Sequence, residues 1–210
     1  MRIGSITHQF VPVETRVPLK FGTETLTSVT CSRIRLEARG SSGAKVTGWG
    51  ETPLSVQWVW PSELPYTERH EALMAFSESL VEAWTDWERE GDALELGHDL
   101  VFEDLPKRLD AFNAKERKGL EPMPWLAALV CASPIDLALH DAFGHSLGRP
   151  TYSCYGRETL AHDLSHYLEP AEDSQVRFAG RYPADYLVPD LPESLPVWHL
   201  VGGLDPLDSS

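Results

Sequence analysis

Apolar and polar residues alternate loosely in separate segments of the first 51 positions, which predicts β-strands. Residues 2–13, 28–39 and 45–51 are each expected to form one strand. In the second segment the apolar phase changes after Cys31, which indicates a β-bulge there. Gly40-Ser41-Ser42-Gly43 is typical of a turn, so the three segments are predicted to form an antiparallel meander.

From Thr67 onward the apolar spacing becomes helical. Three helices are predicted: one from Thr67 to just before Gly91, one around 102–112 with Pro106 in its first turn, and one over 124–147 that Gly148 ends. Within the third run, Ser133 is expected to cap a fresh helix that has Pro134 at its first position. The predicted fold class is therefore α+β, with a three-stranded antiparallel sheet and a helical bundle.

The remaining third of the chain has a different pattern. Residues 157–194 contain four prolines and little periodicity, which favours a loop insertion. The apolar run 195–201 reads as one buried strand that ends at Gly202-Gly203. We therefore expect three parts: a domain over 1–148, a linker or insertion over 149–194, and a strand-bearing segment over 195–210.

Composition narrows the class of protein. The chain has 210 residues and a net charge of −14, from 32 acidic and 18 basic residues, which argues against a nucleic-acid partner. With neither an 18-residue apolar run nor a signal-peptide pattern, we expect a cytoplasmic protein that is not bound to a membrane. Cys31, Cys131 and Cys154 are widely spaced and odd in number, so we expect buried core cysteines rather than disulfides or a zinc site.

Three segments carry a resemblance to a known family. They are Arg16-Val-Pro-Leu-Lys-Phe-Gly22, Gly48-Trp-Gly-Glu-Thr-Pro53, and the run from Ala132 to Pro150 that contains Ile135-Asp136, Ala138 and Asp141. Their order and spacing resemble the enolase superfamily, of the mandelate racemase and muconate-lactonizing type. The chain departs from that pattern after Pro150, where the usual Leu-Leu-Gly-Gly is only Tyr155-Gly156, and in the long segment that follows.

The resemblance implies an N-terminal capping domain over a (β/α)-barrel, with residues 195–201 as the first barrel strand. It implies a racemase, cycloisomerase or dehydratase that abstracts the proton α to the carboxylate of a small substrate, with a divalent metal, usually magnesium, and it is compatible with a homo-oligomer. The family's Lys-x-Lys base and its three metal-binding carboxylates belong to later barrel strands. No lysine follows Lys118, and the only acidic residues after Leu195 are Asp205 and Asp208. We therefore expect a chain truncated before the catalytic barrel, without a catalytic residue or magnesium ligand of its own and inactive alone.

Two loops of the capping domain close over the substrate in this family. They correspond to Lys20–Thr25 and Thr52–Trp60. The resemblance makes Lys20 a candidate for binding a substrate anion, Phe21 and Trp58 or Trp60 candidates for the pocket wall, and His199, near the end of the predicted barrel strand, a candidate substrate contact. The alternatives are a solvated Lys20, tryptophans that pack locally, and a core or interface histidine at 199.

Other pairs of polar residues have helical i,i+4 spacing. Asp136 with His140 and Asp141 with His145 are expected to be surface ion pairs or packing groups rather than metal ligands. His162 and His166 share the spacing within a proline-rich segment. Two other functions remain open: a non-catalytic interaction or binding protein that retains the cap fold, and an unrelated acidic binding domain.

Overall fold

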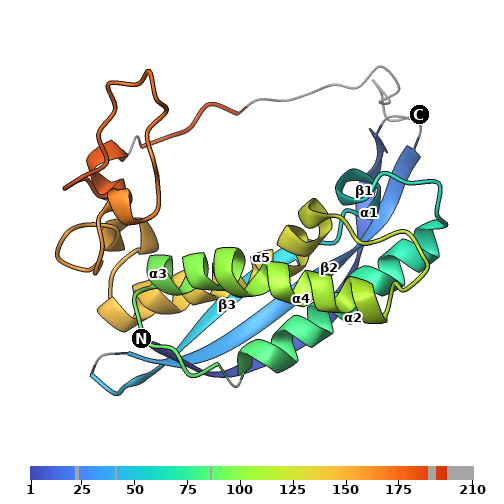
Figure 1. Ribbon diagram of the computed structural model, residues 1–210, viewed down its shortest axis with the longest axis horizontal. Helices are drawn as coiled ribbons and strands as arrows, with labels where there is room; N and C mark the ends of the chain where they lie inside the picture. Colours follow the sequence, from blue (N-terminus) through green and yellow to red (C-terminus); the bar gives the residue numbers. More distant parts are fainter. Residues whose placement is uncertain (22–23, 41, 86, 189–192, 198–210) are drawn as a thin grey trace.

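The computed structural model describes residues 1–21, 24–40, 42–85, 87–188 and 193–197, with the side chains of 19–21 and 24 left aside. Figure 1 shows a sheet covered on one face by helices. In chain order the elements are β1 (Arg2–Phe21), β2 (Glu24–Arg39), β3 (Lys45–Pro53), α1 (Val56–Val59), α2 (Tyr66–Thr85), α3 (Ala93–His98), the π-helical η1 (Asp99–Asp104), α4 (Leu105–Lys115), α5 (Trp125–Leu147), and the 3₁₀ turns η2 (Thr151–Cys154), η3 (Leu164–His166) and η4 (Pro183–Tyr186).

The sheet is antiparallel with strand order β1-β2-β3, which confirms the predicted α+β class and meander. The strands run further than predicted, since β1 continues to Phe21 and β3 to Pro53. Pro12 and Pro18 are tolerated within β1 because it is an edge strand, where a missing backbone N–H leaves no ladder bond unmade on the outer side.

The bulge predicted after Cys31 is wrong. Pairing of β2 with both neighbours continues without a shift through Cys31, Ser32 and Arg33. Ser32 points to the buried face of the sheet, like Ile34, and is only 1% exposed. Its hydroxyl can be buried because it is hydrogen-bonded to a ring nitrogen of His8 at 2.9 Å. The irregularities lie instead in the β1–β2 pairing, between Ile3 and Ser5 and between Glu14 and Leu19.

The β1–β2 ribbon extends beyond the end of β3. The last pair of β2 and β3 is Cys31 with Pro53, whereas β1 and β2 pair as far as Phe21 with Glu24. The segment Lys20–Thr25 was expected as a loop. Its described residues instead end a two-stranded ribbon, in which Lys20 pairs with Thr25 and Phe21 with Glu24. At about 3.3 Å per residue, the ribbon projects roughly 20 Å past β3.

The three predicted helices are present as α2, α4 and α5, whereas α1, α3 and η1 were not predicted, and α2 ends at Thr85 rather than just before Gly91. α2 follows the predicted stripe, and Pro106 lies in the first turn of α4. A fresh helix at Ser133 was wrong: α5 is continuous with Pro134 inside it. Ser133 does not act as a cap, because its hydroxyl is hydrogen-bonded to that of Thr52 at 3.0 Å. Gly148 ends α5 as predicted, in the left-handed conformation with φ 63°.

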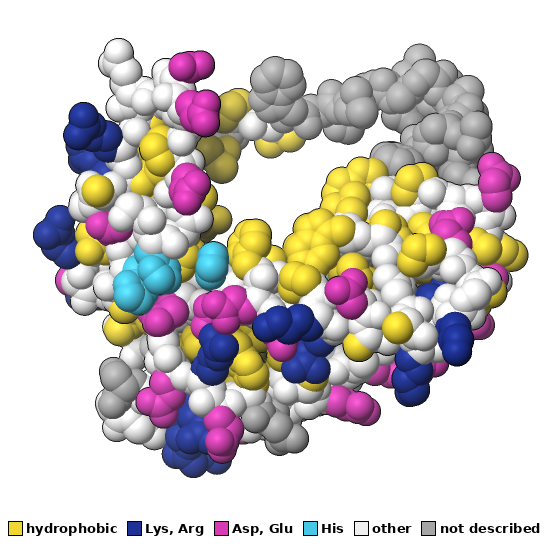
Figure 2. Space-filling model, in the orientation of Figure 1, with side chains coloured by type: hydrophobic (Ala, Val, Ile, Leu, Met, Phe, Trp, Pro, Cys, Tyr) yellow, Lys and Arg dark blue, Asp and Glu magenta, His cyan; other side chains and the backbone are white. Residues whose placement is uncertain are grey.

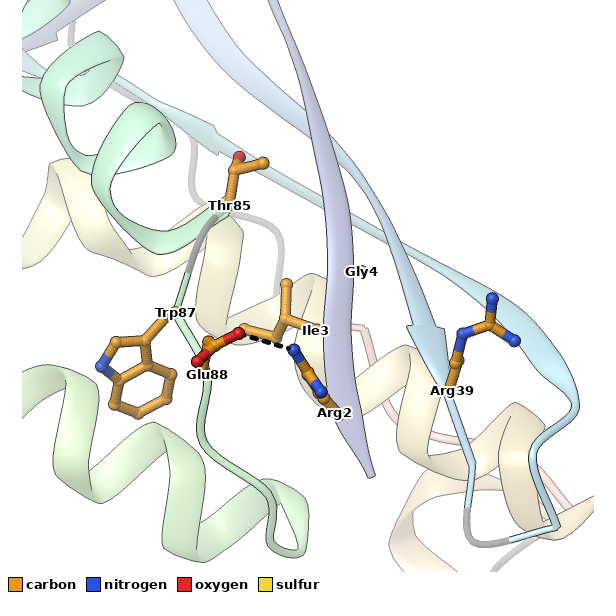
Figure 3. Close-up of a pocket in the computed structure, with 7 residues that line it drawn as sticks. All are labelled: Arg2, Ile3, Gly4, Arg39, Thr85, Trp87 and Glu88. Atoms are coloured by element: carbon orange, nitrogen blue, oxygen red, sulfur yellow. Dashed lines mark hydrogen bonds and ion pairs between the residues drawn. The ribbon is translucent and has the colours of Figure 1, made fainter.

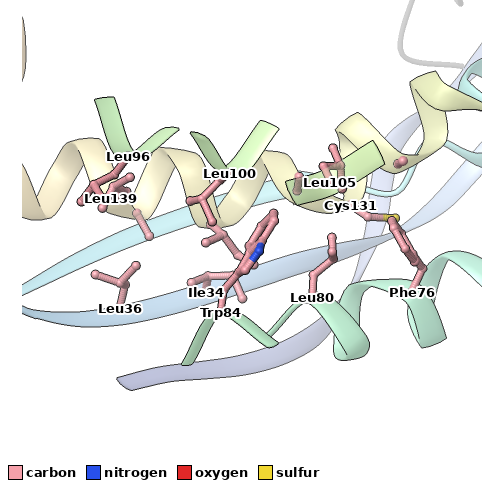
Figure 4. Close-up of a cluster of buried hydrophobic side chains, with 14 of the residues drawn as sticks. Ile34, Leu36, Phe76, Leu80, Trp84, Leu96, Leu100, Leu105, Cys131 and Leu139 are labelled. Carbon is pink, nitrogen blue, oxygen red and sulfur yellow. The ribbon is translucent and has the colours of Figure 1, made fainter. Parts of the chain in front are cut away.

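The core lies between the sheet and two layers of helix. α5 packs on β3 and β2, α2 packs on β1, and α3, η1 and α4 cover α2 and α5 from outside (Figure 1). Figure 4 shows the side chains that meet there: Ile34 and Leu36 from the sheet, Phe76, Leu80 and Trp84 from α2, Leu96, Leu100 and Leu105 from the outer helices, and Cys131 and Leu139 from α5. The three cysteines are free and buried, as predicted. α5 is long and apolar enough to cross a membrane, but most of that stretch is buried in this core.

Past α5, the chain first continues into the same core. Cys154 and Leu160 belong to the buried cluster, and the Ala161 N–H donates to Asp92 Oδ2 at 2.7 Å. The predicted strand 195–201 is not formed over its described part. Residues 195–197 adopt no regular structure, and Leu195 and Val197 are 77% and 89% exposed. No strand of the described residues lies beside them to complete a ladder; residues 198–201 lie outside the described part.

Candidate functional site

Two glycines join two of the three segments that carry the family resemblance. A Cβ atom on Gly48 would lie 2.0 Å from the Ala138 carbonyl oxygen, and one on Gly50 would lie 2.0 Å from that of Pro134. Any side chain at either position would therefore push α5 away from β3. The Gly-x-Gly pattern is a packing feature, since it lets the helix backbone lie directly on the strand.

Side chains of α5 form hydrogen bonds with backbone groups on the outer edge of β3. The Trp49 N–H donates to Asp141 Oδ2 at 2.8 Å, and the Thr47 carbonyl oxygen lies 2.6 Å from His145 Nδ1. Asp141 and His145 also lie 3.9 Å apart, as expected of an i,i+4 pair. An edge strand with free N–H and C=O groups invites pairing with another chain, and these side chains block part of it.

Beside this edge lies a cavity of about 420 Å³, which we call the Trp49 cavity. Its apolar lining comes from Trp49, Leu137, Tyr152 and Tyr155. Its polar lining includes Glu51, His140 and Asp141, and neither lysine nor arginine lines it. Trp49 is 52% and Tyr152 74% exposed, so the cavity leaves aromatic surface open to solvent.

Behind this cavity, three polar side chains form a connected array. Tyr155 Oη is hydrogen-bonded to His140 Nδ1 at 2.8 Å, and His140 Nε2 lies 3.7 Å from Asp136 Oδ1. Burial raises the pKa of Asp136, and the nearby His140 opposes that shift. Burial, with Tyr152 and Asp136 nearby, raises the pKa of Tyr155 to about 12, so Tyr155 is a neutral phenol at physiological pH. The sequence pattern paired Asp136 with His140 but did not include Tyr155. Tyr155 was noted only as a departure from the family pattern.

The predicted substrate contacts that the structure describes lie at one end of the sheet. Lys20 and Phe21 end β1, and their side chains lie outside the described part, as does the whole of His199. Trp58 is in α1 and is 54% exposed. α1 follows β3 directly, and the Leu54 N–H donates to the Thr30 carbonyl at the base of the ribbon, so the Trp58 segment and the ribbon leave the sheet at the same end (Figure 1).

Trp60 does not line a pocket. It is 1% exposed, and its indole N–H donates to Glu121 Oε1 at 2.6 Å. The Arg117 guanidinium lies 5.2 Å from the centre of its ring. The family-based expectation for this residue is therefore wrong, because its side chain turns into the core while Trp58 turns outward.

A cluster of histidines lies near α3. The His162 and His166 rings stack with centroids 4.1 Å apart, and His162 Nε2 lies 3.6 Å from Glu95 Oε1. His98 lies beside them, and Figure 2 shows the visible histidines gathered at one place on that face. Throughout the described part of the chain, no three His, Cys, Asp or Glu side chains are arranged to hold a metal ion.

A further cavity, of about 410 Å³, opens beside the start of β1 (Figure 3). Arg2 and Arg39 line it, together with Thr85, Trp87 and Glu88. Arg2 donates to Glu88 at 3.2 Å, and Figure 3 shows the Arg39 side chain pointing away from Arg2. The two guanidinium groups therefore do not converge on one ligand.

Comparison with known proteins gives several solved structures that are similar to this chain. No protein-family model matches the chain, and no curated protein matches it. The dipeptide epimerase from Methylococcus capsulatus, complexed with Mg and the dipeptide L-Arg-D-Lys, is 21% identical over 78% of this chain and 36% of its own, with a TM-score of 0.45. The L-Ala-D/L-Glu epimerase from Bacillus subtilis is 18% identical over 73% of this chain and 34% of its own, with a TM-score of 0.41.

A mandelate racemase/muconate lactonizing enzyme-like protein from Rubrobacter xylanophilus is similar to the same degree, with 20% identity over 74% of this chain and a TM-score of 0.39. The chain spans about a third of the length of these proteins. The likeness is to enzymes of the mandelate racemase and enolase type. At TM-scores below 0.5 it carries no argument about chemistry, so the functional argument rests on the chain's own residues.

Proposed function

We propose that this chain is the N-terminal capping domain of an enolase-superfamily enzyme of the mandelate racemase and muconate-lactonizing type. The observation that carries the proposal is the contact between its two most specific motifs. Gly48 and Gly50 of the Gly-Trp-Gly-Glu segment lie directly on Pro134 and Ala138 of the α5 motif. Motifs that resemble one family and also fit each other sterically are better support than either motif alone.

The proposed role in substrate selection belongs to the end of the sheet that holds Trp58 and the β1–β2 ribbon. Trp58 would form part of the wall over a small carboxylate substrate, Lys20 would hold its anionic group, and Phe21 and His199 would complete the contacts. The exposed Trp58 beside the base of the ribbon supports this arrangement.

The complete enzyme would abstract a proton α to a carboxylate, with magnesium to stabilise the resulting dianion. Racemisation, cycloisomerisation and dehydration all begin with that step. The described residues do not fit a magnesium site, because no three potential ligands converge among them. We therefore place neither metal binding nor catalysis on this chain, and propose that it is inactive alone, cytoplasmic, and part of a homo-oligomer when complete.

The reading frame that encodes this chain provides the test. A frame that continues past Ser210 into a Lys-x-Lys segment, followed by three acidic residues at successive strand ends, supports the proposal. A frame that stops at Ser210 with no such sequence downstream would contradict it.

The second candidate is a binding protein that retains the cap fold and has no catalytic partner domain. The open aromatic surface of the Trp49 cavity favours it, because monomeric proteins rarely leave clustered aromatic side chains uncovered without a ligand or partner. Ligand binding by the 210-residue chain, together with a frame that ends at Ser210, would select this function.

A further inference from the structure

We propose that the Trp49 cavity binds an alkylated organic ammonium group. This site lies along the β3 edge, away from the Trp58 end of the sheet, and it does not depend on the proposed enzymatic function. A volume of about 420 Å³ lies within the range of cavities that hold small organic ligands.

The walls of the cavity are aromatic and meet at an angle. The Tyr152 and Tyr155 rings lie with centroids 6.2 Å apart and planes at 80°, so they form two adjoining walls. Trp49 provides a third aromatic surface and Leu137 an apolar one. The faces of Trp and Tyr rings carry negative electrostatic potential and attract an ammonium or guanidinium group within about 6 Å.

Two of these aromatic residues are held in place. Trp49 is fixed through its backbone by the hydrogen bond to Asp141, and Tyr155 is fixed by its hydroxyl bond to His140. The pKa of Tyr155 is raised to about 12, so it contributes a neutral ring rather than a phenolate. Tyr152, which is 74% exposed, is the wall left to close over a ligand.

The charge of the lining selects a cation. Glu51 and Asp141 contribute carboxylates, and the lining has no lysine or arginine. Arg33 balances Glu51 from outside the cavity, whereas the hydrogen bond from Trp49 leaves the negative charge of Asp141 on the wall. An anion would be repelled here. A hard metal ion needs about six oxygen ligands around it, and only two carboxylates line this space.

The test compares two probes of the same shape. Choline and its uncharged isostere 3,3-dimethylbutan-1-ol are each titrated into the 210-residue chain, with the indole N–H resonance of Trp49 followed by NMR and assigned with Trp49→Phe. Three aromatic contacts predict that choline binds about 10- to 100-fold more tightly than the alcohol. Equal binding of the two probes, or no binding of choline up to about 10 mM, would overturn the proposal.

Substitutions locate the site. Trp49→Leu and Tyr152→Leu are each expected to weaken choline binding about 3- to 30-fold. Phe102→Leu is the control, because Phe102 is also exposed and aromatic and lies outside this cavity; it is expected to leave the affinity unchanged. All three side chains are more than half exposed, so the variants are expected to fold, which circular dichroism checks. Equal weakening by Phe102→Leu would place the binding elsewhere and contradict the proposal.

The ammonium group has two possible sources, and a third probe separates them. Nα-acetyl-trimethyllysine methylamide carries the same head group on a peptide side chain. Tighter binding of this probe than of choline supports a modified lysine of a protein partner, and tighter binding of choline supports a free solute. Both outcomes support an ammonium site, whereas displacement of neither probe by the other would contradict a single shared cavity.

Discussion

The Trp49 backbone N–H donates a 2.8 Å hydrogen bond to Asp141 Oδ2, which links the Gly-Trp-Gly-Glu strand to the helix that covers it. An aspartate in a helix segment that resembles an enzyme family could be given a catalytic role. This contact gives Asp141 a structural role, since it satisfies a donor on β3, beside which no further strand lies among the described residues.

Removing this carboxylate is expected to destabilise the fold modestly. Asp141→Ala leaves the Trp49 N–H without its charged acceptor, but Asp141 is 37% exposed and water partly replaces it. We expect a loss of about 1 kcal/mol in the free energy of unfolding, measured by urea denaturation. Asp110→Ala, at an exposed aspartate of α4, is the control and is expected to change stability by less than about 0.5 kcal/mol. Equal effects at the two positions would contradict the structural role.

Substitution of the two β3 glycines is expected to be far more damaging. In Gly48→Ala or Gly50→Ala, the new methyl group would meet a carbonyl oxygen of α5 at 2.0 Å, so helix and strand must separate. Because the core depends on that contact, we expect a loss of about 3 kcal/mol or more, or failure to fold.

Gly40→Ala is the control for the glycine substitutions, since its nearest neighbour would be the Ser146 Cβ at 3.3 Å. Its cost is expected to be below about 1 kcal/mol. Thermal unfolding of the three variants measures the difference. If Gly48→Ala were as stable as Gly40→Ala, the close packing of α5 on β3 would be wrong.

The two tryptophans of the 52–60 segment are expected to respond differently to substitution. Trp60→Leu removes a buried ring, its hydrogen bond to Glu121 and its contact with Arg117, which should cost about 3 kcal/mol. Trp58→Leu changes an exposed side chain and should cost less than about 0.5 kcal/mol. Urea denaturation of both variants measures the two losses of stability. A larger loss for Trp58→Leu than for Trp60→Leu would contradict the burial of Trp60 and make it a candidate for the pocket wall again.

Stability is expected to fall in mild acid, in part through His8. Burial lowers the pKa of His8 below its ordinary value, and Glu78 opposes this only in part. Below about pH 6.5 the unfolded chain therefore binds a proton that the folded chain does not, and the free energy of unfolding decreases as the pH falls from 7.5 toward the folded pKa.

His8→Gln is expected to flatten this pH dependence without abolishing it, because burial lowers the pKa of His70 as well. Gln9→Ala, at the next and exposed position of β1, controls for disturbance of the strand. Urea midpoints at pH 7.5 and 5.5 provide the measurement. Identical slopes for the wild-type chain and His8→Gln would show that His8 does not contribute.

The sheet and the helices could be predicted from the sequence because their apolar residues keep a regular period. Ile34 and Leu36 alternate with polar residues, and Leu73, Phe76, Leu80 and Trp84 follow one helical stripe, so local pattern and burial agree. The errors fall where tertiary contacts override local signals. Pro134 lies inside α5, where its carbonyl packs closely on Gly50 of β3, and Ser32 is buried because His8 satisfies its hydroxyl.

The Trp49 cavity could not be predicted in the same way. Its walls come from β3, α5 and the turn that follows α5, which are separated by up to about a hundred residues along the chain. No motif links Trp49 to Tyr152 and Tyr155. The capping-loop residues are proposed only from the family resemblance, since Lys20 and Trp58 carry no periodic signal of their own.

Proton exchange tests the central claim most directly. The product of the complete reading frame that contains this chain is incubated in ²H₂O with magnesium and a panel of dipeptides, acid sugars and mandelate, and mass spectrometry measures deuterium at the substrate α-carbon. The account predicts magnesium-dependent exchange by the complete product and none above a metal-only blank by the 210-residue chain. Exchange by the 210-residue chain alone, or none by a complete product with any of these substrates, would contradict the assignment of this chain as a capping domain.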